Sequence, residues 1–163
     1  MYDKPEVCKT CGGRCCKQCP GASSPSDFGL PGPEGEQRVK AALATGRYCI
    51  DWWEGDAREG VYEAFDHPEH RYRSFYIRPC VKGKEQQLTD TSWGGMCTFW
   101  VLDKGCELSS ANRPHECQML EPGEADNGTQ CKSHLGRMGR RSICVAWMAY
   151  DKLFEELLKG DRR

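Results

Sequence analysis

The sequence predicts a small, irregular α+β domain, rich in loops, that is held together by a metal centre. Twelve of its 163 residues are cysteines, five of them between residues 8 and 19. Eighteen glycines and nine prolines indicate much irregular backbone. Only 38% of the residues are hydrophobic, cysteine included, which leaves few large apolar side chains for a core. A thin core with many loops usually needs a cross-link from disulfides or metal.

Length and charge narrow the classes of protein to consider. We expect one domain over residues 1–163, since chains of this length usually form a single core. The 23 basic and 24 acidic residues nearly balance, which gives no signal for binding nucleic acid. No run approaches the ~20 apolar residues of a membrane span, and residues 1–6 lack the start of a secretory signal. We therefore expect a cytoplasmic protein whose partner is a protein or a small molecule.

The first part of the chain contains one clear helix pattern. Residues 1–20 are rich in Gly and Cys, and we expect no regular structure there. The Gly, Ser and Pro of residues 21–33 are typical of an ordered loop or linker. Residues 34–45 predict a short helix, and Gly46 stands where such a helix would end. The apolar face of this helix would comprise Val39, Ala42 and Leu43.

Two strands are expected in the middle of the chain. Residues 47–53 end in paired tryptophans and predict a short strand, with a turn at residues 54–56. Residues 74–81 alternate well enough for a second strand, which Pro79 must end or confine to a sheet edge. Residues 82–95 are polar and predict a loop.

The clearest strand pattern is residues 96–102, which are rich in β-branched and aromatic side chains. A turn at residues 103–105 would return the chain through residues 106–108. This arrangement predicts a small hairpin with Cys97 and Cys106 near its two ends.

The C-terminal part of the chain predicts helices. Residues 113–120 would form one or two helical turns, and residues 142–159 a longer amphipathic helix. Ser142 is a plausible N-cap of the longer helix and Gly160 its stop. The apolar stripe would consist of Ile143, Trp147, Tyr150, Phe154, Leu157 and Leu158.

Two separated sets of cysteines carry the main chemical signal. The first reads C-x2-C-x3-C-C-x2-C-P and begins at Cys8. The second consists of Cys97, Cys106, Cys117 and Cys131. Clustered cysteines in a reducing compartment hold metal more often than they form disulfides, and adjacent cysteines seldom bridge each other. We therefore expect metal binding, with a disulfide scaffold as the alternative.

The spacing alone does not choose the metal. A zinc ribbon would show a second C-x2-C pair, and the second set has none. The first set also differs from the bacterial ferredoxin run C-x2-C-x2-C-x3-C-P, although Cys16-x2-Cys19-Pro20 is similar to its end.

Two blocks of the chain resemble a known family. The first block is Cys8-x2-Cys11-Gly-Gly-Arg-Cys15-Cys16. The second runs from Cys97 through an aromatic–leucine segment to Gly-Cys and then to Arg-Pro-x-x-Cys. Together they resemble the YkgJ-like cysteine-cluster proteins, named for a C-x2-C-x2-3-C-C signature and described as zinc- or iron-chelating domains. The resemblance covers residues 8–19 and 94–120 and leaves residues 21–93 as an insert.

The resemblance implies a compact metal-chelating domain without an assigned reaction. By position it implies a ligand set of Cys8, Cys11, Cys15, Cys16, Cys97, Cys106 and Cys117. Cys131 follows the second block and is a further candidate ligand, whereas the family pattern does not require Cys19.

Residues between the cysteines suit a thiolate centre. Lys9, Arg14 and Lys17 can offset the negative charge of several thiolates and lower the pKa of the thiols. Gly12 and Gly13 allow backbone amides to turn toward sulfur. A further cation, Arg113, would either bond to a sulfur or a carbonyl or form a surface salt bridge.

Seven or eight thiolates exceed one tetrahedral site. They fit two zinc sites, one cluster plus one zinc ion, or one [4Fe–4S] cluster with spare thiols. The adjacent cysteines and the uneven spacing favour an iron–sulfur cluster over two zinc ribbons. The centre would be structural or serve partner binding; the alternatives are an iron–sulfur enzyme, an electron-transfer protein, and a metal store or chaperone.

Other notable residues have simpler interpretations. We expect Cys49, Cys80 and Cys144 to be buried as small apolar side chains. His67 and His70 are separated by a proline that prevents helical alignment, so both are expected in an exposed loop, and His115 could support a metal ligand. The five tryptophans are interpreted as core, with an aromatic substrate pocket as the alternative. A solvated surface is expected for Arg137, Arg140 and Arg141.

Overall fold

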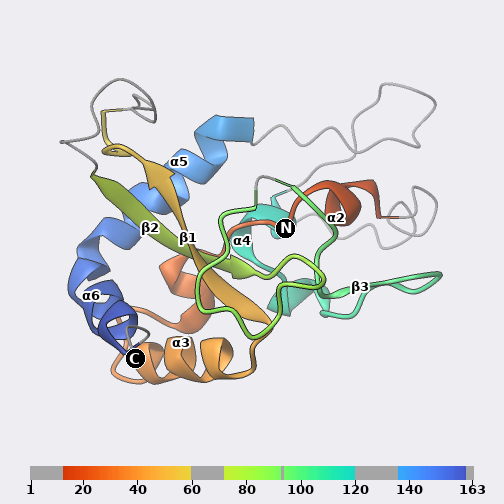
Figure 1. Ribbon diagram of the computed structural model, residues 1–163, viewed down its shortest axis with the longest axis horizontal. Helices are drawn as coiled ribbons and strands as arrows, with labels where there is room; N and C mark the ends of the chain where they lie inside the picture. Colours follow the sequence, from red (N-terminus) through yellow and green to blue (C-terminus); the bar gives the residue numbers. More distant parts are fainter. Residues whose placement is uncertain (1–12, 60–71, 93, 120–135, 161–163) are drawn as a thin grey trace.

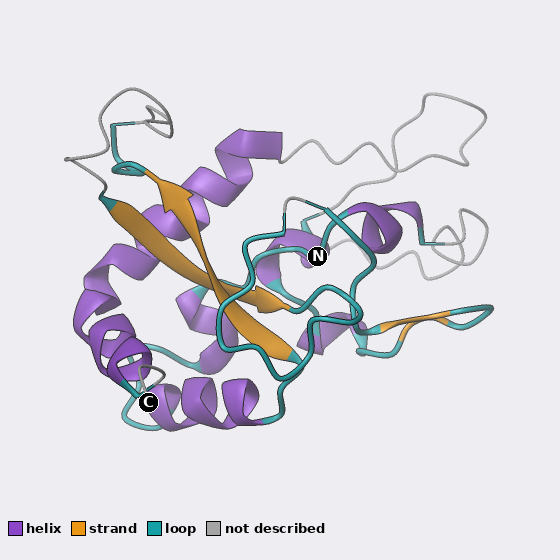
Figure 2. Cartoon of the chain, viewed as in Figure 1, coloured by secondary structure: helices purple, strands orange, loops and turns teal. Residues whose placement is uncertain are grey.

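The computed structural model describes residues 13–59, 72–92, 94–119 and 136–160 (Figure 1). They form short helices and two small antiparallel sheets, which confirms the predicted α+β class. Figure 2 shows how much of the described chain is loop. In chain order the elements are α2 (Arg14–Gln18), η1 (Pro25–Phe28), α3 (Gly35–Ala44), β1 (Tyr48–Glu54), β2 (Arg73–Pro79), β3 (Trp100–Val101), β4 (Gly105–Cys106), η3 (Ser110–Asn112), α4 (His115–Gln118), α5 (Gly136–Trp147), η4 (Met148–Tyr150) and α6 (Asp151–Lys159).

The central sheet pairs β1 with β2 in antiparallel register, Tyr48 opposite Pro79 and Glu54 opposite Arg73. Both strands were predicted within a residue or two, and β2 ends at Pro79 as expected. Two loop segments extend this pair by single bridges. Ser23 lies beside β2, and the 88–90 segment lies beside β1. Backbone pairing in this sheet therefore extends beyond its two named strands.

The main core lies between the central sheet and helices α3, α5 and α6, which Figure 1 shows around it. The predicted helix at 34–45 is confirmed by α3, which buries Val39 and is followed by Gly46 in left-handed backbone at φ 70°. Lys40 of α3 forms an ion pair with Glu156 of α6 at 3.9 Å. The largest buried apolar side chains of the core are Trp147, Phe154, Ile50, Ile77 and Val39. The core interpretation is thus confirmed for Trp147, whose indole also donates to the Ser23 carbonyl at 2.7 Å.

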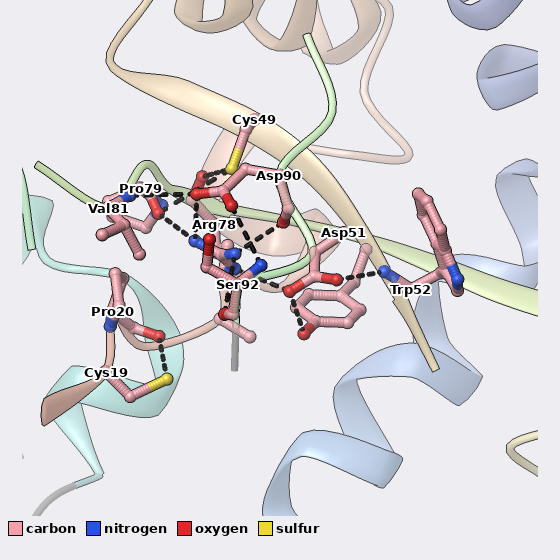
Figure 3. Close-up of polar contacts among 12 residues, drawn as sticks. Cys19, Pro20, Cys49, Asp51, Trp52, Arg78, Pro79, Val81, Asp90 and Ser92 are labelled. Carbon is pink, nitrogen blue, oxygen red and sulfur yellow. Dashed lines mark hydrogen bonds and ion pairs between the residues drawn. The ribbon is translucent and has the colours of Figure 1, made fainter. Parts of the chain in front are cut away.

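A buried ion-pair network joins the sheet to the loop that follows it (Figure 3). The Arg78 side chain is 0% exposed, and its Nε donates to Asp51 Oδ2 at 2.7 Å. Its Nη2 donates to the Asp90 carbonyl at 2.6 Å, and its Nη1 lies 3.4 Å from Asp90 Oδ2. The Tyr76 hydroxyl donates to the same Asp51 oxygen at 2.8 Å. Arg78 therefore holds residue 90 against β2.

A second, smaller core cluster contains Cys97, Phe99 and Trp100. The predicted strand at 96–102 is too long: β3 covers only Trp100–Val101 and pairs with β4, so Cys106 lies opposite Trp100. The preceding residues bond elsewhere, because Lys82 N donates to the Met96 carbonyl and Thr98 N to the Cys80 carbonyl. The hairpin is thus confirmed, but Cys97 precedes it.

Two further expectations need correction. Residues 1–20 were expected to lack regular structure, yet α2 is a helix, which begins after Gly13 in left-handed backbone at φ 70°. The C-terminal helix was expected from Ser142, but α5 already begins at Gly136, and η4 separates it from α6. Residues 136–141 carry no apolar stripe, so the helical periodicity of the sequence begins several residues after the helix itself. The stop before Gly160 and the single turn of α4 are confirmed.

In the part of the chain that the structure describes, no helix combines the length and apolar character needed to cross a membrane. The expected loop histidines His67 and His70 lie outside the described residues.

Candidate metal centre

The two cysteine blocks meet along one backbone contact. Cys97 N donates to the Cys16 carbonyl at 2.6 Å, and Gly95 N donates to the Gln18 carbonyl at 2.8 Å. The end of α2 and the segment before β3 therefore lie side by side, although about eighty residues separate them in sequence. This contact brings the Cys15–Cys16 pair to the cluster that contains Cys97.

Cys117 of α4 reaches the same region from a third segment. A Cβ built on Gly21 would lie 2.5 Å from Cys117 Sγ and 3.2 Å from Cys117 N, so only glycine allows this approach. Helix α4 is held there by Glu116, whose N donates to the Ala22 carbonyl at 3.0 Å and whose Oε2 accepts from Ala22 N at 2.6 Å. Residues 21–22 therefore form a cradle for the Cys117 sulfur.

The thiols are close enough to change one another's pKa values. The hydrogen bond between the Cys15 and Cys16 thiols lowers the pKa of Cys15 to about 6 and raises that of Cys16 above its ordinary value. Burial and the neighbouring thiols raise the pKa of Cys16 further. Burial raises the pKa of Cys97 to about 11, and nearby Cys106 adds to the shift. Burial, then Cys97 and Cys15, raise the pKa of Cys117 well above its ordinary value.

Five of the eight predicted ligands are thus neighbours: Cys15, Cys16, Cys97, Cys106 and Cys117. The other three, Cys8, Cys11 and Cys131, lie outside the described residues. Within the described ranges no three His, Cys, Asp or Glu side chains converge closely enough to hold a metal ion. All described cysteines are free, including the half-buried Cys15, Cys16, Cys106 and Cys117.

Cations lie over the aromatic rings of the cluster that contains Cys97. Lys17 Nζ lies 4.9 Å and Lys82 Nζ 5.6 Å from the centre of the Trp100 ring. The Arg47 guanidinium lies 4.0 Å from the Phe99 ring. Arg113 lowers the pKa of Cys15 and donates from Nε to the Leu108 carbonyl at 3.4 Å, one of the two roles expected of it. Such charges can offset several thiolates placed together.

Arg140 is a site residue that sequence reasoning missed. It was expected on a solvated surface, but its Nη1 and Nη2 lie 3.5 and 3.6 Å from Cys19 Sγ. The same guanidinium donates to Glu116 Oε2 at 2.8 Å and to the Pro20 carbonyl at 3.1 Å. Arg141 likewise donates to the Ala57 carbonyl at 2.6 Å. The early start of α5 places both arginines against the domain, and no periodic signal in the sequence indicated it.

Cys19 is therefore placed differently from the other thiols. Its Sγ–H donates to the Pro20 carbonyl at 3.4 Å, as Figure 3 shows, and its sulfur accepts from Arg140 Nη1 at 3.5 Å. Glu116, which accepts from both Arg140 and Ala22, connects this contact to the cradle of Cys117. Arg140 thus links α5 to both cysteine blocks.

Three other cysteines lie in the interior, as expected. Cys49, Cys80 and Cys144 are each 0% exposed. A hydrogen bond between the Cys49 and Cys80 thiols raises the pKa of Cys49 and lowers that of Cys80. Burial raises the pKa of Cys144 to about 12.

A cavity of about 570 Å³ opens on another face of α4. His115 and Met119 line it together with residues of η1, α5 and η4. His115, considered in the sequence as a possible support for a metal ligand, lines this cavity, and its backbone N donates to Asp27 Oδ2 at 2.7 Å. The lining is mostly small and apolar: Ser24, Pro25, Ser26, Leu30, Gly139, Ser142, Ile143, Ala146, Ala149 and Tyr150 complete it.

The chemistry of the site fits a metal with a preference for sulfur. Its donors are thiols, which select zinc or iron–sulfur over magnesium or calcium. The cradle at Gly21 fixes one sulfur, and the Trp100 indole N–H is buried without a partner among the described residues. The described donors are therefore of the kind that such a centre needs, although no three of them converge in the described part of the chain: Cys15, Cys16, Cys97, Cys106 and Cys117.

Fold and site together define a small α+β protein with a thiol-rich centre built from separated segments. No family model, curated protein or solved structure matches the chain. The likeness to the YkgJ-like proteins therefore stays a prediction.

Proposed function

We propose that the chain is a metal-binding protein that holds an iron–sulfur centre or zinc through cysteines of its two blocks. The observation that carries this proposal is the backbone contact of Cys16 with Cys97, which joins the two blocks into one group of interacting thiols. The hydrogen bond with Cys15, burial and the neighbouring thiols raise the pKa of Cys16, because nearby thiolates repel one another. Metal binding converts that repulsion into coordination, because thiolates are the binding form.

The proposed role of the metal is to hold the domain together or to present a binding surface. The contacts around the centre come from α2, β3, β4 and α4, so a metal there would tie four short elements that have little core of their own. The free thiols suit a reducing compartment such as the cytoplasm. The YkgJ-like resemblance supports the same class of function.

The alternative is an active centre, in an iron–sulfur enzyme or an electron-transfer protein. Its support is that Cys15 and Cys106 are only half-buried, so one edge of the centre would be open to a partner. A centre with an open edge can exchange electrons or accept a ligand, whereas a closed one is structural.

Anaerobic purification followed by metal and sulfide analysis and a visible spectrum tests the proposal. Broad visible absorption with stoichiometric iron and sulfide supports the cluster, and a colourless protein with bound zinc supports the zinc form. Purified protein free of metal that also takes up neither ion under reducing conditions would refute metal binding.

Alanine variants locate the centre. C16A, C97A and C117A should each lose metal, because each removes a sulfur from the group. C144A is the matched control, since Cys144 is equally a buried thiol but belongs to the main core. Full metal content in the three site variants would place the metal elsewhere.

A further inference from the structure

Cys49 and Cys80 are two buried thiols on one face of the central sheet. Cys49 of β1 lies opposite Arg78 of β2, and Cys80 follows two residues later, directly after the strand ends at Pro79. Cys80 N donates to the Arg47 carbonyl at 2.9 Å, which continues the ladder past the strand end. Side chains two residues apart on a strand point to the same face, so Cys80 is the diagonal neighbour of Cys49. Both thiols are free and 0% exposed.

The two thiols are in contact with each other. The hydrogen bond between them is the largest influence on the pKa of either, raising that of Cys49 and lowering that of Cys80. Cys49 Sγ also lies 3.6 Å from the Arg78 carbonyl and 3.9 Å from the Pro79 carbonyl, so it reaches across to the strand that leads to Cys80 (Figure 3). Cys80 Sγ lies 3.6 Å from the Gly46 carbonyl. Two hydrogen-bonded sulfurs need only a short approach to reach the ~2.0 Å of an S–S bond.

The surroundings favour the thiolate of one member of the pair. The thiol of Cys49 donates to the Cys80 sulfur, and the positive charge of Arg78 also lowers the pKa of Cys80. Burial raises that pKa, but these two contacts outweigh it. The thiolate is the nucleophilic form of cysteine. Cys80 is therefore the thiol that reacts first, and Cys49 is the thiol that stands beside it.

Burial decides which oxidant can reach the pair. Neither sulfur is exposed, so an oxidant as large as glutathione disulfide has no access to them in the folded protein. Hydrogen peroxide is close to water in size and can reach them through small local openings at the end of β2. The site therefore selects a small peroxide.

We propose that Cys49 and Cys80 are a redox-active dithiol that hydrogen peroxide converts into an intramolecular disulfide. The Cys80 thiolate attacks one peroxide oxygen: an S–O bond forms, the O–O bond breaks, and the released hydroxide takes up the proton that Cys80 lost, giving water. The Cys49 sulfur then attacks the Cys80 sulfur: the S–S bond forms, the S–O bond breaks, and the leaving hydroxyl takes the Cys49 proton as a second water. The two sulfurs together lose two electrons, which the peroxide gains. Neither cysteine belongs to the proposed ligand set, so the inference does not depend on metal binding.

Peroxide treatment of the reduced, full-length protein tests the inference. After alkylation of the remaining thiols in denaturant, peptide mapping by mass spectrometry should find a Cys49–Cys80 disulfide that dithiothreitol reverses. Cys144 is the matched control, because it is equally 0% exposed but belongs to the main core. It should stay a thiol, which also shows that the protein remained folded. Glutathione disulfide in place of peroxide should leave Cys49 and Cys80 free, and a glutathione adduct on either would overturn the selection of a small oxidant.

Serine variants assign the two roles. C49S should lose the disulfide and accumulate a sulfenic acid at Cys80, which dimedone traps, whereas C80S should leave Cys49 a free thiol. C144S should form the disulfide like the wild type. Cys49 and Cys80 that stay free in the wild type, at a peroxide dose that oxidises the denatured chain, overturn the inference, as does pairing of either with another cysteine. These two outcomes are measured on the wild type, so they decide even where a variant fails to fold.

Discussion

Replacing Arg78 with methionine removes a fully buried cation while keeping an unbranched apolar side chain in place of the arginine stem. The variant leaves the Asp51 and Asp90 carboxylates buried, at 10% and 2% exposed, without their shared cation. Asp51 keeps the Tyr76 hydroxyl at 2.8 Å, and Asp90 keeps backbone donors from Val81 and Ser92. Two desolvated carboxylates that retain only neutral donors make the folded state much less stable.

Breaking a buried ion pair from one side costs about 3–5 kcal/mol. For a chain of this size, each kcal/mol shifts the melting temperature by about 2–4 °C, so R78M should melt ~6–20 °C lower. Urea unfolding at pH 7 measures the free energy of unfolding, and a thermal scan measures the melting temperature. R38M is the control, because Arg38 pairs with Glu34 on the exposed face of α3, with 60% and 71% of the two side chains exposed. The free energy of unfolding of R38M should fall by no more than ~0.5 kcal/mol.

A loss below ~1 kcal/mol in R78M, similar to that of an exposed pair, would refute the reasoning, because it would mean that the carboxylates find other partners or water.

The variant should also weaken metal binding. Asp90 Oδ2 accepts from Val81 N, and Val81 forms an antiparallel bridge with Cys97. An Asp90 carboxylate without its cation would shift and, through its bond with Val81, displace the segment that positions Cys97. Unchanged metal affinity in a destabilised R78M would contradict the predicted effect on metal binding and leave the predicted loss of stability intact.

Three further predictions follow from single contacts. G21A should lose most of its metal, since the new Cβ would lie 2.5 Å from Cys117 Sγ. The control variant G160A should keep its metal, because a Cβ there makes only an ordinary 3.5 Å contact. Metal analysis of both variants tests this prediction. Burial opposes ionisation of Asp90, but hydrogen bonds from Ser92 and the Arg78 charge outweigh it and lower its pKa. Stability contributed by Asp90 is therefore present above about pH 4 and lost as the pH falls through the depressed pKa. In D90N the free energy of unfolding in urea should therefore fall less steeply at acidic pH than in the wild type. The same fall in both proteins would contradict this. Because burial raises the pKa of Cys144 to about 12, this thiol should resist iodoacetamide at pH 8 until the protein unfolds, as mass spectrometry of native and denatured samples would reveal; rapid native labelling contradicts it.

Local patterns predicted the elements whose signals lie within a few residues. Helix α3 has an apolar face and a glycine stop, β1 carries paired tryptophans, and β2 has alternating side chains. Residues 96–99 are an exception, because β-branched and aromatic side chains favour a strand but do not say which segment will pair with it. Here they bond to residues 80–82, so only Trp100–Val101 remained for the hairpin.

The site was predictable as a set of thiols but not as a geometry. The resemblance to the YkgJ-like proteins implied that Cys16, Cys97 and Cys117 belong together, and the structure places them within electrostatic reach. The residues that make this possible carry no sequence signal. Gly21 matters only because Cys117 lies beside it, and Arg140 only because α5 begins at Gly136, seven residues before its apolar stripe starts at Ile143. Long-range contacts of this kind depend on the tertiary fold.

The bond between Cys97 N and the Cys16 carbonyl also has a consequence for synthesis of the chain. Translation proceeds at about 5–20 residues per second, so Cys16 precedes Cys97 by roughly 4–16 s. During that interval the first thiols are made but lack the segment that will cover them. A newly made chain is thus exposed to oxidation or to unwanted metal before its own partner cysteines exist. Oxidative conditions should harm the nascent protein far more than the finished one.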